Sequence, residues 1–153
     1  MNLLLDTNIL VLYSRHDELA ERMETALQLM SGSHDLFISI VTIGEIEAVI
    51  HKTGIGPTRQ RRLRGFIHSN KITKITIEHG TIYSNYGIID AISQAKLRRS
   101  DSEFTSRNMG KNDLWIAATA ATFDLTLVTT DKDFDHLAEH YIDLRYVDIG
   151  QYK

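Results

Sequence analysis

Short apolar runs that stop at polar residues limit the possible folds of this chain more than any other pattern. Leu3, Leu4 and Leu5 end at Asp6, and a second, mostly apolar run covers 125–128. A strand buried on both faces is apolar along its length, whereas a half-exposed strand alternates apolar and polar residues. Both runs are also too short for helices. The pattern therefore predicts strands inside a parallel sheet.

Segments with helical periodicity separate the predicted strands. This alternation indicates βαβ units with right-handed crossovers, and therefore an α/β protein with three layers, α/β/α, around a central, mainly parallel sheet. The 153 residues suit one domain, so we expect residues 1–153 to form a single unit. Further strands are expected at 36–38, 72–77 and 145–149, helices at 7–13, 18–30, 42–52, 59–69, 78–97 and 113–122, and a mobile loop at 98–111.

The composition excludes several classes of protein. No cysteine occurs, so the chain has neither a disulfide framework nor a thiolate metal site, which suits a reducing cytoplasm. Asp6 interrupts the first apolar run and no basic flank precedes it, so a signal peptide is not expected at the start of the chain. No apolar stretch approaches the roughly 20 residues that a membrane span needs, and we expect no membrane partner.

The net charge of −3 conceals an uneven distribution. Between Lys52 and Lys111, twelve Lys or Arg residues oppose four acids, giving +8, and the rest of the chain has five against sixteen, giving −11. Such a basic region can bind a nucleic acid on one face of an acidic protein, although a solvated helix surface explains the charges equally well. The candidate nucleic-acid contacts are Arg59, Arg61, Arg62, Arg64, Arg107 and Lys111, with Arg98 and Arg99 as further members.

Four acids lie where α/β proteins bind ligands, beyond the carboxyl ends of predicted strands or at the start of a following helix. They are Asp6, Glu45, Asp113 and Asp131. Carboxylates that converge on one sheet edge repel one another and do not all stay ionised without a cation. Carboxylate oxygens favour a hard divalent ion such as Mg²⁺ or Mn²⁺, which can activate water for phosphodiester hydrolysis. Together the acids predict a metal-dependent hydrolytic site.

Each acid taken alone also has a structural interpretation. Glu45 follows Thr42 by three residues, which is the spacing of a capping box. Asp113 fits the first turn of a helix, and Asp131 fits the cap of a short helix at 134–137. Asp6 is harder to explain in this way, because an acid directly after a buried strand needs a partner.

Several stretches of the chain resemble the motifs of one family. They are Leu4–Asn8, Glu45 within a helix, Asn112–Ala118 and Leu127–Phe134. In this order and spacing the chain resembles PIN-domain ribonucleases, and more narrowly the VapC toxins of type II toxin–antitoxin pairs. The resemblance covers essentially the whole chain and implies a PIN-like α/β/α fold. The site residues that it implies are Asp6, Glu45, Asp113 and Asp131 as catalytic metal ligands, Asp133 as an assistant or replacement for Asp131, and Thr7, Asn8 and Thr129 as hydrogen-bonding supports.

The resemblance also implies an activity and partners. We expect a Mg²⁺-dependent endoribonuclease, with Mn²⁺ as a substitute, that cleaves structured RNA such as tRNA or rRNA through a metal-activated water. The expected partners are a cognate VapB-like antitoxin and a second copy of the chain in a homodimer, and the expected location is the cytoplasm. The alternative is a catalytically inactive or RNA-processing PIN domain that serves as an RNA-binding module.

Two other α/β classes fit less well. A haloacid-dehalogenase-like phosphatase also has an acid after a short first strand, but it needs a second Asp two residues later, where this chain has Asn8. A dinucleotide-binding module needs a Gly-x-Gly-x-x-Gly sequence after the first strand, and the chain has none there.

Overall fold

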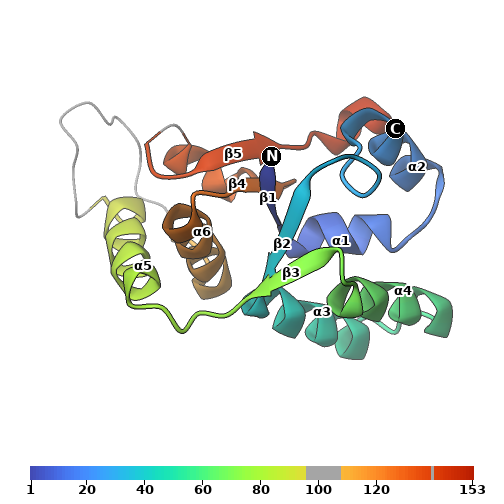
Figure 1. Cartoon of the computed structure of the whole chain (residues 1–153), viewed down its shortest axis with the longest axis horizontal. Helices are drawn as coiled ribbons and strands as arrows, with labels where there is room; N and C mark the ends of the chain where they lie inside the picture. The colour runs from blue at the N-terminus through green and yellow to red at the C-terminus, as the bar shows by residue number, and fades with distance from the viewer. Residues whose placement is uncertain (96–107, 139) are drawn as a thin grey trace.

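The computed structural model describes residues 1–95, 108–138 and 140–153 (Figure 1). Its strands are β1 (Asn2–Leu5), β2 (Asp35–Ser39), β3 (Ile72–Ile75), β4 (Thr126–Thr129) and β5 (Asp143–Tyr146). They form one five-stranded sheet with the order β3-β2-β1-β4-β5. Each neighbouring pair is parallel, so the predicted parallel sheet is confirmed.

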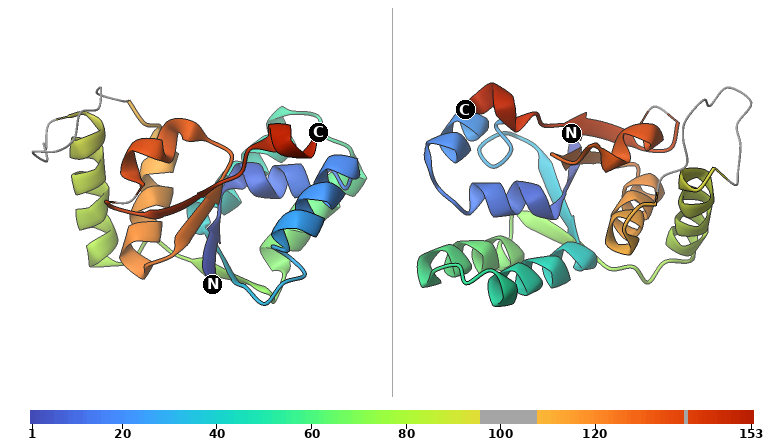
Figure 2. Two further views of the ribbon diagram at one scale, coloured as in Figure 1. Left: turned by 90° about the horizontal axis from the view of Figure 1, so that it is seen from above. Right: turned by 180° about the vertical axis from the view of Figure 1, so that it is seen from behind.

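Helices cover both faces of the sheet and complete the three layers, as predicted (Figures 1 and 2). One face carries α1 (Thr7–Tyr13), α2 (Glu18–Leu27), α3 (Ile40–Lys52) and α4 (Pro57–His68). The other face carries α5 (Gly80–Ser93), α6 (Lys111–Phe123) and the 3-10 helix η1 (Lys132–Leu137). A second 3-10 helix, η2 (Ile149–Tyr152), contacts α2. Within the described ranges, no helix has the length and apolar character needed to cross a bilayer.

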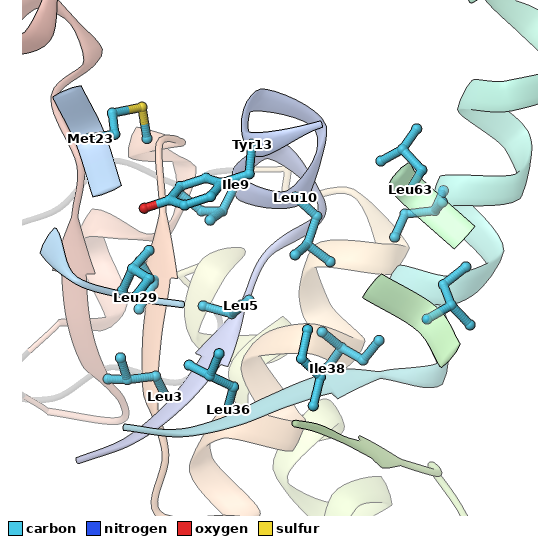
Figure 3. Close-up of a cluster of buried hydrophobic side chains, with 14 of the residues drawn as sticks. Leu3, Leu5, Ile9, Leu10, Tyr13, Met23, Leu29, Leu36, Ile38 and Leu63 are labelled. Atoms are coloured by element: carbon cyan, nitrogen blue, oxygen red, sulfur yellow. The ribbon is translucent and has the colours of Figure 1, made fainter. Parts of the chain in front are cut away.

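The leucine run of β1 is buried on both faces of the sheet. Leu3 and Leu5 belong to the core beneath α1 to α4, where they meet side chains such as Ile9 and Leu36 (Figure 3). Leu4 points the opposite way, into the core beneath α5 and α6. Burial of one such side chain stabilises a fold by about 1.5–3 kcal/mol, so both layers are anchored on this strand. The absence of polar residues in the run follows from this double burial.

The start of α3 differs from the prediction. Ser39 is the N-cap, because its hydroxyl accepts a hydrogen bond from the backbone N–H of Val41 at 3.1 Å. The helix therefore begins at Ile40 and not at Thr42. A capping box needs the capping residue three positions before the acid, so the capping-box interpretation of Glu45 is wrong.

Other boundaries shift by a few residues. Helix α2 ends at Leu27 because Gln28 adopts a left-handed conformation with φ 48°. Strand β5 (Asp143–Tyr146) begins and ends earlier in the chain than the expected strand at 145–149, which it overlaps in part. Most of the predicted loop at 98–111 lies outside the described residues, and α6 already includes Lys111.

The strand order reverses beside β1. Strands β2 and β3 extend the sheet on one side of β1, whereas β4 and β5 extend it on the other. In an open parallel sheet this reversal is the switch point, where the connections leave in opposite directions and ligands bind at the carboxyl ends of the strands. Asp6 follows β1 and Asp131 follows β4, so both acids lie at the switch point.

Candidate active site

Asp6 lies at the centre of the candidate site. Its backbone N–H donates to the carbonyl of Val128 at 3.0 Å, which extends the pairing of β1 with β4. The side chain is buried and only 4% exposed. Its Oδ1 accepts from the backbone N–H of Thr7 at 2.7 Å, and its Oδ2 accepts from the Thr129 hydroxyl at 2.6 Å. The Asp6 carboxylate thus caps α1 and connects it to β4 across the switch point.

Glu45 reaches the same region from α3. It is partly buried, and its Oε1 accepts a hydrogen bond from the Thr7 hydroxyl at 3.2 Å. Glu47, two residues later, points to another side of the helix, where it forms a two-point ion pair with Arg64. Glu45 is therefore the glutamate of α3 that interacts with Asp6.

Three further aspartates converge beside β4. Asp113, Asp131 and Asp133 each place a carboxylate oxygen within 4.8 Å of the other two. Asp113 lies in the first turn of α6, whereas Asp131 caps η1 by accepting from the backbone N–H of Asp133 at 2.8 Å. The backbone N–H of Asp131 donates to the Thr129 hydroxyl at 3.0 Å. One hydroxyl therefore contacts both Asp131 and the Asp6 carboxylate.

These five acids form one electrostatic unit, which we call the acidic group: Asp6, Glu45, Asp113, Asp131 and Asp133. Burial, followed by the negative charges of the other four acids, raises the pKa of Asp113 to about 7. Burial also raises the pKa of Asp6, with a smaller contribution from Asp131, although the hydrogen bonds from Thr129 and Thr7 oppose this. Burial and the charge of Asp6 raise the pKa of Glu45. Each raised pKa shows that, without a bound cation, ionisation of the group is less favourable in the folded protein than in water.

The acidic group has the chemistry of a site for a hard divalent cation. Its side chains offer only carboxylate oxygens, which are the ligands that Mg²⁺ and Mn²⁺ prefer. A bound cation stabilises the ionised forms of acids whose pKa values are otherwise raised. The residues present therefore fit the metal, and Asp113, Asp131 and Asp133 lie close enough together to share one ion.

The residues expected to support the acids differ in their placement. Thr7 and Thr129 are buried, and their hydroxyl groups contact Glu45 and Asp6 as described above. Asn8 is exposed on α1. Within the part of the chain that the structure describes, no hydrogen bond joins the Asn8 side chain to the acidic group.

Two of the predicted nucleic-acid contacts are engaged in packing α4 against α1. Arg59 donates to the hydroxyl of Ser14 at 2.9 Å and to the carbonyl of Val11 at 3.0 Å. Arg62 donates to the carbonyl of Ser14 at 3.3 Å. These acceptors lie at the C-terminal end of α1, whereas Asp6 caps its N-terminal end. Arg59 and Arg62 therefore hold two helices together at a distance from the acidic group.

The other predicted contacts occupy different surroundings. Arg61 is exposed and donates to the Thr58 hydroxyl, while Arg64 is paired with Glu47. Lys111 is exposed at the start of α6, two residues before Asp113. Arg98, Arg99 and Arg107 lie outside the described residues.

The sequence patterns predicted only an assisting or replacing role for Asp133, and they predicted no role in the site for Gly110. Gly110 is the N-cap of α6, and a Cβ atom at this position would lie 3.2 Å from Oδ2 of Asp113. The glycine therefore allows its backbone to approach the carboxylate closely. The available signals were the two-residue spacing of Asp133 from Asp131 and a glycine just before an acid-bearing helix start.

Comparisons with known proteins agree with this architecture. The sequence matches the family model of the PIN domain over residues 3–140. Among solved structures, VapBC2 from Rickettsia felis, bound to a DNA fragment from their promoter, matches with a TM-score of 0.75 at 23% identity, covering 97% of this chain and 100% of the other.

Two further structures give similar agreement. VapBC-1 from nontypeable Haemophilus influenzae has a TM-score of 0.67 at 19% identity, over 95% of this chain and 98% of the other. VapBC-5 from Mycobacterium tuberculosis, a member of the VapBC family of toxin-antitoxin systems, has a TM-score of 0.65 at 20% identity with the same coverage. Among curated protein sequences, none matches this chain significantly. At these identities the structural matches show a shared fold.

Proposed function

Because the chain belongs to the PIN domain family, whose model matches residues 3–140, we propose that it is a metal-dependent endoribonuclease and the toxin of a VapBC-like pair. The observation that carries this proposal is the convergence of the acidic group on the switch point, where its charges help to raise the pKa of Asp113 to about 7. Ionised carboxylates at this density destabilise a protein unless a cation binds them. Helix caps alone do not require such a concentration of acids.

In the proposed mechanism, the aspartates Asp113, Asp131 and Asp133 would hold Mg²⁺, or Mn²⁺ in its place, and Asp6 and Glu45 would complete the site. When bound, the metal would lower the pKa of a water molecule and neutralise charge that develops on the phosphate. The hydroxyl groups of Thr129 and Thr7 keep the Asp6 and Glu45 carboxylates in a fixed orientation. The acids would thus bind the metal, and the two threonine hydroxyl groups would keep two of these acids oriented.

We propose structured RNA, such as tRNA or ribosomal RNA, as the substrate. The exposed side chain of Lys111 lies two residues from Asp113 and is well placed in the chain to contact a phosphate near the acidic group. Arg61 offers a second exposed cation. Unpaired loops suit recognition because their bases are splayed out and accessible. Phosphate contacts of this kind make the binding weaker as the salt concentration rises.

We further propose a cognate antitoxin and a second copy of the chain as protein partners, acting in the cytoplasm. The fold shared with members of VapBC toxin-antitoxin systems supports the first partner. Light scattering on the purified chain tests the dimer, for which we expect twice the mass of one chain. Co-purification from the natural host tests the antitoxin, for which we expect a small protein that suppresses RNA cleavage.

Cleavage of purified tRNA and ribosomal RNA tests the enzyme activity. The wild-type protein is incubated with Mg²⁺, with Mn²⁺ and with EDTA, beside Asp113→Asn and a matched control, Asp135→Asn. Asp135 is an exposed acid of η1 outside the acidic group, so the control makes the same charge change elsewhere. We expect cuts at a few sites with either metal, none in EDTA, none with Asp113→Asn, and wild-type cuts with Asp135→Asn.

The ends of the fragments test the mechanism. Attack by water leaves a 5′-phosphate and a 3′-hydroxyl, whereas attack by the neighbouring ribose hydroxyl leaves a 2′,3′-cyclic phosphate. Recovery of cyclic ends would exclude the proposed mechanism. If the folded wild-type protein binds RNA but leaves it intact with both metals, the chain is an RNA-binding module instead.

A further inference from the structure

A buried contact outside the acidic group joins segments that carry its aspartates. Ser93, the last residue of α5, is fully buried. Its hydroxyl oxygen lies 2.7 Å from Nε2 of His136 and donates to the sulfur of Met109 at 3.2 Å. The sequence patterns gave no reason to connect these three residues.

The tautomer of His136 determines the direction of its hydrogen bond with Ser93. A hydroxyl group has one proton to donate, so the Ser93 proton serves only one of the two contacts. Both contacts are satisfied when Nε2 of His136 carries a proton and donates to Ser93, while Ser93 donates to Met109. Because a thioether is a weak acceptor, the bond between Ser93 and His136 is the stronger of the two.

Each partner of Ser93 is close in the chain to members of the acidic group. His136 belongs to η1, the helix that Asp131 caps and that contains Asp133. Met109 directly precedes Gly110, the N-cap of α6, and the first turn of α6 holds Asp113. Helices α5 and α6 lie side by side, and η1 shares their side of the sheet (Figure 2). Ser93 therefore links the segment just before α6, whose first turn holds Asp113, to η1, which contains Asp133 and is capped by Asp131.

The short helix η1 depends on such tertiary contacts for its orientation. It has six residues, and 3-10 helices have poorer hydrogen-bond geometry than α-helices. Phe134 and Leu137 anchor its apolar side in the core. Apolar packing has little directional preference, whereas the hydrogen bond between His136 and Ser93 restricts the orientation of η1.

We propose that Ser93 and His136 are positioning residues that set the distance between Asp113 and the pair formed by Asp131 and Asp133. This inference rests on the proposed function, because the spacing of these acids matters most if they share one cation. Loss of the bond lets η1 shift relative to α6, so that the three carboxylates no longer converge. The expected consequence is weaker binding of the metal, independent of any RNA.

Titration of the purified chain with Mn²⁺, followed by electron paramagnetic resonance, tests the inference. Loss of a hydrogen bond behind metal ligands typically weakens metal binding 10- to 100-fold, and we expect about tenfold for Ser93→Ala, which is at the lower end because Ser93 does not touch a ligand itself. Thr119→Ala is the matched control. It also removes a fully buried hydroxyl, which donates to the Trp115 carbonyl within α6, and we expect wild-type affinity.

A second pair of variants tests the partner side chain and does not depend on the folding of Ser93→Ala. The amide nitrogen of Gln reaches about as far as Nε2 of His, so His136→Gln restores a donor to Ser93. His136→Leu fills similar space without a donor. We expect His136→Gln to keep an Mn²⁺ affinity near that of the wild type and His136→Leu to lose about tenfold.

The possible outcomes separate this inference from the proposed function. Wild-type affinity in both Ser93→Ala and His136→Leu would overturn the inference and leave the proposed function intact, even if both variants are less stable. Absence of Mn²⁺ binding in the wild-type protein would overturn the metal site, and the inference with it. Weaker binding in Thr119→Ala, equal to that in Ser93→Ala, would show a general effect of lost buried hydroxyls and would also overturn it.

Discussion

The charge state of Asp113 depends strongly on its surroundings. Its pKa is about 7 in the folded protein, against an ordinary value of 3.8. Between about pH 4 and pH 7 the folded chain therefore keeps a proton that the unfolded chain has released, so the free energy of unfolding without metal falls as the pH rises through this window. Above about pH 7, Asp113 is ionised in both states, and the free energy of unfolding falls no further through this group. Asp113→Asn removes this contribution, and we expect the variant to be more stable than the wild-type protein at pH 8.

Urea denaturation in EDTA at pH 5 and pH 8 measures this effect. Asp135→Asn, which changes an exposed acid, serves as the control and is expected to follow the wild-type pH dependence. A lower midpoint for Asp113→Asn at pH 8 would mean that Asp113 mainly stabilises the start of α6 as a first-turn acid.

The hydroxyl of Thr129 gives a second prediction at this scale. It donates to Asp6 and accepts from the backbone N–H of Asp131. Thr129→Val keeps the shape of the side chain but leaves the buried Asp6 carboxylate with one donor fewer, and we expect a loss of about 1–3 kcal/mol in the free energy of unfolding at pH 7. Urea denaturation beside Thr126→Val, at the other end of β4, measures it. Equal losses in the two variants would contradict a special role of Thr129.

The strand pattern made the positions of two site residues predictable. Asp6 and Asp131 follow buried strands, so the parallel sheet places both at one edge. The contact between Ser93 and His136 was not predictable, because it depends on how α5 packs beside α6 and η1. Linear spacing does not record that packing.

At the scale of elements, the start of α6 determines where Asp113 lies. A Cβ atom at Gly110 would stand 3.2 Å from the Asp113 carboxylate, which is tighter than ordinary contact, so Gly110→Ala displaces the carboxylate. We expect weaker Mn²⁺ binding in titrations of Gly110→Ala. Gly87→Ala in α5 is the control, since a Cβ there meets nothing within 4 Å. We expect Gly87→Ala to bind Mn²⁺ normally and to gain about 0.5–1 kcal/mol of stability. Normal binding in Gly110→Ala would contradict the close fit.

The elements themselves show which sequence patterns are reliable. Strand β1 was predicted because burial on both faces leaves a continuous apolar run. The start of α3 was predicted two residues late, because Ser39 both ends β2 and caps the helix. The spacing of Thr42 and Glu45 satisfies a local rule for a helix start. The tertiary contact of Glu45 with Thr7 instead reflects the acidic group, which no local rule contains.

For the whole molecule, metal binding and folding are coupled. A cation that binds only the folded chain stabilises it by about 2.7 kcal/mol at 100 times its Kd, which corresponds to a rise in Tm of roughly 5–10 °C for a chain of this size. We expect this rise with Mg²⁺ or Mn²⁺ in thermal denaturation, and its loss in Asp113→Asn. NaCl at the same ionic strength is the control. An equal rise with NaCl would indicate general charge screening in place of a metal site.

The hydrogen bond between Thr129 and Asp6 joins residues that are 123 positions apart in the chain. A ribosome makes β1 and α3 early, but the growing chain cannot bring the acids together until β4 and Asp131 have been added. A nascent chain that stops before β4 therefore carries Asp6, Glu45 and Asp113 but lacks Thr129, Asp131 and Asp133. If the chain has the proposed ribonuclease activity, we expect unfinished chains to lack it and to leave the ribosome and messenger RNA that produce them intact.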